Sequence, residues 1–159
     1  MNPRTLERYT IPGPSGKLEV ALNVPAEPVG IALIAHPNPV DGGTLDNKVV
    51  HTLARTFYSL SYVAARFNYR GAGASEGTFD AGRGEVDDAR AALAHVRERI
   101  GTLPLALAGF SFGAFVVAQL APQDAPERMV LVGPAMARDS FMAALAASIH
   151  DGVVFADPV

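Results

Sequence analysis

The residues best suited to covalent chemistry lie in the stretch Gly109-Phe110-Ser111-Phe112-Gly113, a serine with a glycine on each side at a distance of two residues. The apolar run at residues 105–108 leads into this stretch, and an apolar segment of helical composition, residues 114–120, follows it. This layout is typical of a nucleophile elbow, a sharp strand-to-helix turn whose crowding is relieved by small neighbours. Such a turn places the serine hydroxyl at a helix N-terminus, where free N–H groups stabilise developing negative charge. We therefore predict that Ser111 is a nucleophile; a structural serine is the alternative.

A second group of candidate residues lies in the loop after the apolar run at residues 29–35. This loop is rich in glycine and proline, and its sequence is His36-Pro37-Asn38-Pro39-Val40-Asp41-Gly42-Gly43-Thr44. A serine nucleophile on a parallel sheet needs an oxyanion donor from a loop in this position, besides the amide that follows the serine. We predict the N–H groups of Phe112 and Asn38 as the two donors, because Pro37 has none. The predicted oxyanion or substrate-binding loop also includes His36, Gly42 and Gly43, and a plain turn is the alternative.

Histidine is the usual general base, and three of the histidines can be judged from their neighbours. His36 stands before a proline at a strand end, where a histidine more often anchors its loop than acts as a base. His51 and His95 fall in predicted helices beside arginine and glutamate, so we expect both to be exposed and inert. No histidine pairs with another histidine or with glutamate at metal-ligand spacing, and no metal site is predicted.

The glycine-rich stretch Gly71-Ala72-Gly73-Ala74-Ser75-Glu76-Gly77 offers a different function, dinucleotide binding. Its last glycine is one residue late for that motif, and the carboxylate of Glu76 would face a pyrophosphate. The acidic residue expected to end a second strand about 20 residues later is also missing. A tight turn that leads from a strand into a helix is the favoured interpretation.

Composition sets the class of protein. The chain has 159 residues, of which 49% are hydrophobic and 18% charged, so we predict one globular domain over residues 1–159. A net charge of −3 gives no electrostatic case for nucleic acid or an anionic membrane. The chain has no cysteine, and its polar start lacks the apolar core of a signal peptide. We expect a soluble, cytoplasmic protein.

The elements that must position these residues follow from the hydrophobic pattern. Short, nearly continuous apolar runs at residues 29–35, 62–67, 104–108 and 129–132 predict strands buried on both faces, and residues 18–24 predict an earlier, half-exposed strand. Stripes at helical spacing lie between the runs, one from Val49 to Phe57 with Asp46 as its cap and one from Val86 to Ile100. The alternation predicts an α/β fold, a mainly parallel sheet with helices on both faces.

Several motifs, taken in their order along the chain, resemble a small, lid-less bacterial family of α/β-hydrolases. The resemblance implies an α/β-hydrolase fold and a Ser-Asp/Glu-His triad in that chain order. It also implies an esterase-like activity on a small-molecule substrate, with no cofactor. The motifs are His36-Pro37, Gly42-Gly43-Thr44, Asp46-Asn47-Lys48-Val49-Val50, Arg66-Phe67-Asn68-Tyr69-Arg70-Gly71, Gly73-Ala74-Ser75-Glu76-Gly77, Gly84-Glu85-Val86-Asp87-Asp88 and Ala108-Gly109-Phe110-Ser111-Phe112-Gly113.

The end of the chain departs from this family. The segment around Ile149-His150-Asp151-Gly152 resembles a shortened form of the segment that carries the acid, which makes Asp151 the candidate acid. The family's last strand, helix and catalytic histidine have no match, and we expect them to be lacking here. His150 cannot easily serve Asp151, because neighbours on a strand point to opposite faces.

Two hypotheses follow for the function of the chain. It is either a serine hydrolase with impaired activity, or a catalytically silent domain or interaction module that keeps the elbow only as architecture. In both cases we expect an apolar strand, at residues 129–132 or 153–155, to form a sheet edge that invites self-association.

Overall fold

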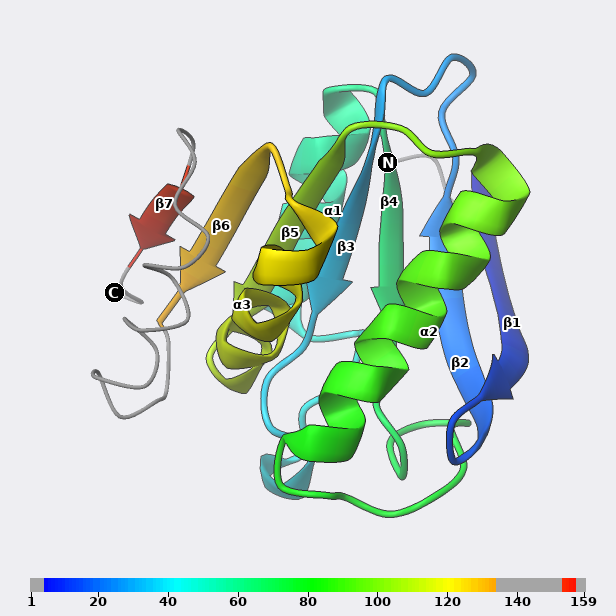
Figure 1. Ribbon diagram of the computed structural model, residues 1–159, viewed down its shortest axis with the longest axis vertical. Helices are drawn as coiled ribbons and strands as arrows, with labels where there is room; N and C mark the ends of the chain where they lie inside the picture. The colour runs from blue at the N-terminus through cyan, green and yellow to red at the C-terminus, as the bar shows by residue number, and fades with distance from the viewer. Residues whose placement is uncertain (1–4, 134–152, 157–159) are drawn as a thin grey trace.

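The computed structural model describes residues 5–133 and the backbone of residues 153–156. These residues form a seven-stranded sheet with the order β1-β2-β4-β3-β5-β6-β7 (Figure 1). The strands are β1 (Leu6–Gly13), β2 (Gly16–Asn23), β3 (Gly30–Ala35), β4 (Tyr62–Phe67), β5 (Leu105–Phe110), β6 (Arg128–Val132) and β7 (Val153–Ala156). The pairs from β4 to β7 are parallel, whereas β2 runs antiparallel to both β1 and β4.

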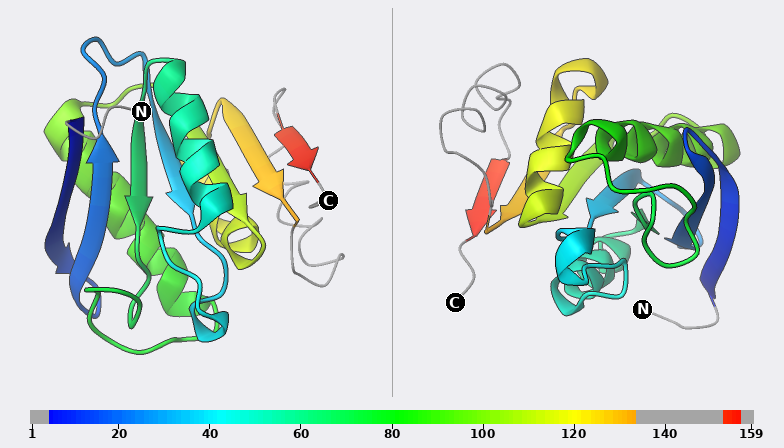
Figure 2. Two further views of the ribbon diagram at one scale, coloured as in Figure 1. Left: turned by 180° about the vertical axis from the view of Figure 1, so that it is seen from behind. Right: turned by 90° about the horizontal axis from the view of Figure 1, so that it is seen from below.

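Helices cover both faces of this sheet. Helix α1 (Lys48–Ser59) packs on one face, and α2 (Arg83–Ile100) and α3 (Phe112–Asp124) pack together on the other (Figure 2). The prediction of a mainly parallel sheet between two helical layers is therefore confirmed. All three helices begin at the edge where the parallel strands end (Figure 1), and that edge carries the candidate site.

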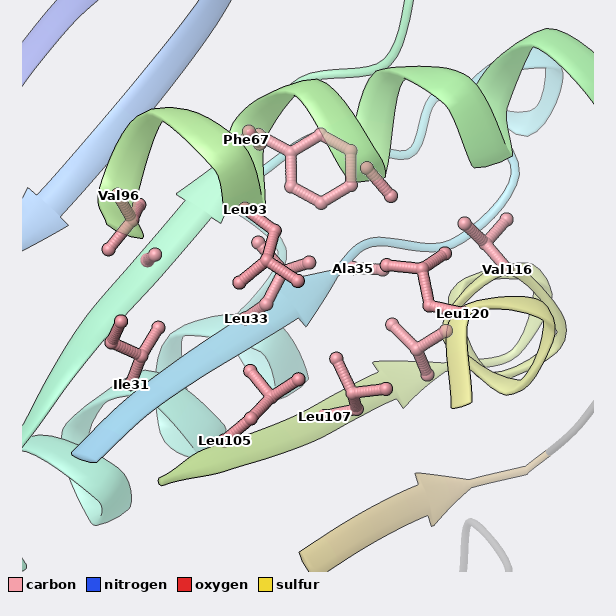
Figure 3. Close-up of a cluster of buried hydrophobic side chains, with 14 of the residues drawn as sticks. Ile31, Leu33, Ala35, Phe67, Leu93, Val96, Leu105, Leu107, Val116 and Leu120 are labelled. Carbon is pink, nitrogen blue, oxygen red and sulfur yellow. The ribbon is translucent and has the colours of Figure 1, made fainter. Parts of the chain in front are cut away.

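The central strand β3 shows why its sequence lacks polar alternation. Ile31, Leu33 and Ala35 belong to the core cluster under α2 and α3, while Ala32 and Ile34 belong to the smaller cluster under α1. All six β3 residues are buried, since each face of the strand contacts a helical layer. In Figure 3 the side chains of β3 and β5 extend toward those of α2 and α3. This double burial fixes where the central strands end, and hence where the site lies.

Two local predictions were wrong or incomplete. The cap of α1 is Asn47 and not Asp46: the Asn47 carboxamide oxygen accepts from the N–H groups of Val49 (2.9 Å) and Val50 (3.2 Å). Asp46 lies one residue too early to reach these donors. Strand β1 was missed because it is an outer strand with mostly exposed side chains, so its sequence lacks an apolar stripe.

Candidate active site

The backbone at Ser111 has the sharp turn that the sequence predicts. Ser111 stands between β5 and α3 with φ 56° and ψ −117°, a conformation that non-glycine residues rarely adopt. Its N–H donates to the carbonyl oxygen of Val132, the last residue of β6 (2.8 Å). This hydrogen bond holds the turn against the neighbouring strand. Strain of this kind persists only where the surrounding structure holds it in place.

The two glycines of the motif permit this turn. A Cβ atom on Gly109 would lie 2.3 Å from the carbonyl oxygen of Gly113, and one on Gly113 would lie 2.1 Å from the carbonyl oxygen of Ala35. Both distances are far below van der Waals contact, and the opposing atoms belong to the backbone. The start of α3 therefore packs directly against the end of β3, which brings the serine turn beside the loop that begins at His36.

The two backbone N–H groups predicted as oxyanion donors have no acceptor among the described residues. The N–H of Phe112, at the start of α3, and the N–H of Asn38 donate no hydrogen bond to any described residue. Both belong to segments that leave adjacent parallel strands, β5 and β3. Phe112 itself is nearly buried, so the position of its amide is fixed by packing.

The loop after β3 forms a short 3-10 turn, η2 (Pro39–Asp41). The side-chain oxygen of Asn38 accepts from the N–H of Val40 (2.9 Å). The backbone carbonyl oxygen of Asn38 accepts from the N–H of Gly43 (3.0 Å). The N–H of Gly42 donates to the carbonyl oxygen of Pro39 (3.1 Å). The N–H groups of Gly42 and Gly43 therefore donate to acceptors within the loop itself. They shape it, and neither is left to serve an oxyanion, whereas the Asn38 amide donates to no described residue.

His36 is fully buried where β3 enters this loop. Its Nδ1 lies 2.7 Å from the carbonyl oxygen of Pro37, and its Nε2 lies 3.3 Å from the N–H of Tyr69, which donates to it. Burial lowers the pKa of His36 from 6.5 to about 4, although the Pro37 carbonyl opposes the shift. His36 is therefore a neutral imidazole at pH 7 with both nitrogens occupied, as expected for a residue that anchors a loop.

Two adjacent residues after β4 hold both ends of the loop. The Tyr69 hydroxyl donates to the carbonyl oxygen of His36 (3.0 Å), and the Tyr69 ring packs against the Phe112 ring with centroids 5.5 Å apart. The Asn68 carboxamide oxygen accepts from the N–H of Leu45 (2.8 Å) at the far end of the loop. Neither residue was predicted from the sequence to have a role. Polar side chains directly after a buried strand were the signal that could have found them.

A buried polar group supports Asn68. Its carboxamide N–H₂ donates to Glu19 on β2 (2.6 Å), and Glu19 in turn accepts from the N–H of Ala74 (2.9 Å) and pairs with Arg8 (2.7 Å). Arg8 also forms two hydrogen bonds to Asp46 (3.0 and 3.1 Å). Through these contacts the loop after β3 is joined to the β1–β2 hairpin.

The stretch 71–77 is the turn that the sequence analysis favoured over a dinucleotide loop. The N–H groups of Gly71, Ala72 and Ser75 donate to backbone carbonyl oxygens within or next to the turn. The N–H of Glu76 donates to the carbonyl oxygen of Lys17 (2.8 Å), and the Glu76 carboxylate accepts from the N–H of Lys17 (2.8 Å). With these groups engaged, the turn has few donors left for a pyrophosphate.

The remaining catalytic candidates do not meet at Ser111 within the described residues. The Ser111 hydroxyl forms no hydrogen bond there, His51 lies on α1, and His95 on α2 lies 2.7 Å from the Tyr9 hydroxyl. Asp151 and His150 lie outside the described residues. Among the described residues no group of carboxylates and imidazoles could hold a metal ion, and no helix is long and apolar enough to cross a membrane.

The chain is similar to known hydrolases in both sequence and structure. A family model described as serine aminopeptidase, S33, matches residues 40–153. An α/β serine hydrolase homologue from Coxiella burnetii is 32% identical with a TM-score of 0.80, over 96% of this chain and 86% of that one. A lid-less α/β serine hydrolase from Xanthomonas campestris is 30% identical with a TM-score of 0.82, over 99% of this chain and 85% of that one.

A curated relative from Rickettsia prowazekii, described as an uncharacterized protein, is 40% identical over 110 residues. The match includes 68% of this chain and 46% of the relative, so the chain spans less than half the length of that protein.

Proposed function

The chain belongs to the serine aminopeptidase (S33) family of α/β-hydrolases, and from that premise we propose that it is an esterase-like serine hydrolase with Ser111 as its nucleophile. The observation that carries the proposal is the turn at Ser111. A strained serine at a helix start, with the unengaged amides of Phe112 and Asn38 on adjacent segments, is the arrangement that acyl transfer requires.

In the proposed reaction the Ser111 oxygen forms a bond to an ester carbonyl carbon, and the carbonyl electron pair moves onto its oxygen. The N–H groups of Phe112 and Asn38 donate to this oxyanion. When the electron pair returns, the bond to the alcohol breaks, the alcohol leaves with a proton, and an acyl-serine remains. Water then attacks the acyl-serine in the same way and releases the acid, which restores the Ser111 hydroxyl.

The proton of Ser111 needs a base, and the described histidines are poorly placed to supply one. His36 is buried with both nitrogens engaged, and His95 interacts with Tyr9. We propose that the acid of the triad is Asp151 and that no histidine of this chain serves as its partner. General-base catalysis contributes roughly 10²- to 10⁴-fold, so we expect feeble turnover by the 159-residue chain.

Covalent labelling tests the nucleophile. Treatment with a fluorophosphonate followed by peptide mass spectrometry should place the adduct on Ser111, and the labelling should be slow without a base. Ser111→Ala should abolish it. Ser59→Ala, which removes a hydroxyl from the exposed end of α1, is the matched control and should leave it unchanged. An adduct on another serine would refute the assignment. A folded chain that is never labelled would instead favour the catalytically silent domain.

The pH dependence of turnover tests whether a histidine of this chain acts as the base. With 4-nitrophenyl acetate the rate should rise with hydroxide concentration, because a serine without a base depends on its own ionisation. A sigmoidal profile with a midpoint near 6 to 7, where a free histidine titrates, would show that a histidine of this chain is the base. The expectation of an impaired enzyme would then be wrong.

We also propose that the chain self-associates through the β7 edge. Strand β7 pairs with β6 on one side and with no described strand on the other. An open strand edge offers unpaired N–H and carbonyl groups to a second chain. Light scattering should detect a species larger than the monomer. A monomer that melts in one sharp, cooperative transition would contradict this.

A further inference from the structure

A cluster of four polar side chains joins β1 to α2, and the reaction proposed at Ser111 does not use it. Glu7 and Tyr9 are two residues apart on β1, so both point to the same face of that strand. His95 and Arg99 are four residues apart on α2, so they are neighbours on one side of the helix. The last turns of α2 lie beside β1 (Figure 1), and the two pairs meet there.

The Tyr9 hydroxyl is the centre of this cluster. The Nε2 atom of His95 lies 2.7 Å from its oxygen, and Arg99 donates to the same oxygen from a terminal nitrogen (3.0 Å). A guanidinium can only donate, so among the described residues the imidazole is the group that can take the proton of the hydroxyl. One phenolic oxygen thus has both a proton acceptor and a cation within hydrogen-bond distance, the arrangement that activates a hydroxyl as a nucleophile.

Packing and an ion pair hold these groups in place. The Tyr9 ring packs against the hydrophobic core and meets the His95 ring edge-on, with centroids 5.5 Å apart. The hydrogen bond from Arg99 lowers the pKa of Glu7, so this carboxylate is ionised at neutral pH and keeps the guanidinium beside Tyr9. The sequence predicts an exposed His95, whereas in the structure it is half-buried against Tyr9.

The other three tyrosines of the chain lack this arrangement. Tyr69 is fully buried. Tyr58 is half-buried like Tyr9, and its hydroxyl accepts a long hydrogen bond from the Thr5 hydroxyl (3.4 Å). Among the described residues, no imidazole or guanidinium forms a hydrogen bond to the hydroxyl of Tyr58, Tyr62 or Tyr69. Tyr58 is therefore a natural reference for the reactivity of Tyr9.

We propose that Tyr9 is a second nucleophile of this chain, which accepts activated acyl groups with His95 as its general base. The Tyr9 oxygen forms a bond to the acyl carbon while its proton passes to Nε2 of His95. The bond between the acyl carbon and the leaving group breaks, and the leaving group takes the bonding pair and then the proton from the imidazolium. The guanidinium of Arg99 stabilises the negative charge that develops on the Tyr9 oxygen. The product is O-acyl-Tyr9, one equivalent per chain.

This site is separate from Ser111 and open to small molecules. The strands β2, β4 and β3 lie between β1 and β5, the strand that leads to Ser111. At about 4.8 Å per strand, β1 and β5 are roughly 19 Å apart. The hydrogen bond between Arg99 and Tyr9 is exposed, so a small acyl donor can reach the oxygen. Acylation of Tyr9 therefore does not depend on the proposed hydrolase function.

The test compares two tyrosines within one chain that carries Ser111→Ala, which removes the competing nucleophile. The folded chain is treated with N-acetylimidazole, and peptide mass spectrometry follows the acetylation of Tyr9 and Tyr58 over time. General-base catalysis contributes roughly 10²- to 10⁴-fold, so Tyr9 should react at least about tenfold faster than Tyr58. Adding His95→Gln should lower the Tyr9 rate to about that of Tyr58. Adding Arg99→Gln should lower the rate by a smaller factor, because the base remains.

His51→Gln is the control, because it removes an exposed histidine from α1 on the opposite face of the sheet. It should leave the Tyr9 rate unchanged, and circular dichroism verifies that each variant is folded. Equal rates at Tyr9 and Tyr58, or a Tyr9 rate that survives His95→Gln, would overturn the proposal. If the His95 variant does not fold, the ratio of the two tyrosine rates in the Ser111→Ala chain decides alone.

Discussion

The burial of His36 predicts that the stability of this protein depends on pH in a defined window. The unfolded chain binds a proton at His36 near pH 6.5, whereas burial lowers the pKa in the folded protein to about 4. Between these two pH values the unfolded state carries the extra proton. The contribution of His36 to stability is therefore fully present above pH 6.5 and is lost progressively as the pH falls toward 4.

The magnitude follows from the size of the shift. One pKa unit corresponds to about 1.4 kcal/mol, so a fall of the His36 pKa from 6.5 to about 4 amounts to roughly 3 kcal/mol of unfolding free energy. This is a large share of the 5–15 kcal/mol typical of a domain of this kind. Protonation must also break the acceptor role of Nε2 toward the N–H of Tyr69, since a protonated imidazole has no acceptor.

Urea unfolding at several pH values between 7 and 4.5 measures the effect. The wild-type chain should lose stability across this range by roughly 2.4 kcal/mol more than a His36→Gln variant, which keeps a hydrogen-bonding side chain but cannot titrate. His51→Gln on the exposed side of α1 is the control and should retain most of the slope. If His36→Gln proves too unstable, NMR titration of the His36 ring settles the point. A midpoint near 6.5 in the folded chain, or equal slopes with and without His36, would refute the reasoning.

Three further substitutions test contacts that hold the site. Gly113→Ala should cost about 3 kcal/mol in urea unfolding, because its Cβ would lie 2.1 Å from a backbone carbonyl at the end of β3; a stable, unchanged variant would show that the elbow relaxes. Tyr69→Phe should cost about 1–2 kcal/mol, since it leaves the His36 carbonyl without its donor (3.0 Å); no loss would mean that the carbonyl finds another donor. Asp88→Ala should cost about 3 kcal/mol by leaving the partly buried Arg70 guanidinium unpaired; thermal unfolding compared with Asp87→Ala, a more exposed neighbour, provides the control.

The central sheet could be predicted because its strands are buried on both faces. The run at residues 62–67 is apolar except for Arg66, and β4 has these bounds. The same reasoning failed for β1, whose exposed face and outer position give no apolar pattern. It also misplaced the cap of α1 by one residue, because only the local backbone decides whether Asp46 or Asn47 reaches the free N–H groups.

The geometry at Ser111 followed from the sequence for a similar reason. The spacing of two glycines around a serine after an apolar run specifies a close approach, and the structure has that approach at Ala35. The position of Asn68 and Tyr69 directly after a buried strand marks them as candidates, but their partners could not be predicted because the contacts join segments more than 20 residues apart.

The proposed oxyanion site depends on residues that have no part in the chemistry. The Asn38 amide lies on a loop and the Phe112 amide on a helix, so their relative position is fixed only if something contacts both. Tyr69 does so, through its hydroxyl to the His36 carbonyl and its ring on Phe112. Burial raises the pKa of Tyr69 well above its usual range, so the hydroxyl is protonated and remains a donor at neutral pH. Preorganised donors stabilise an oxyanion without reorganisation during the reaction, and here the preorganisation comes from β4, a strand that contributes no catalytic group of its own.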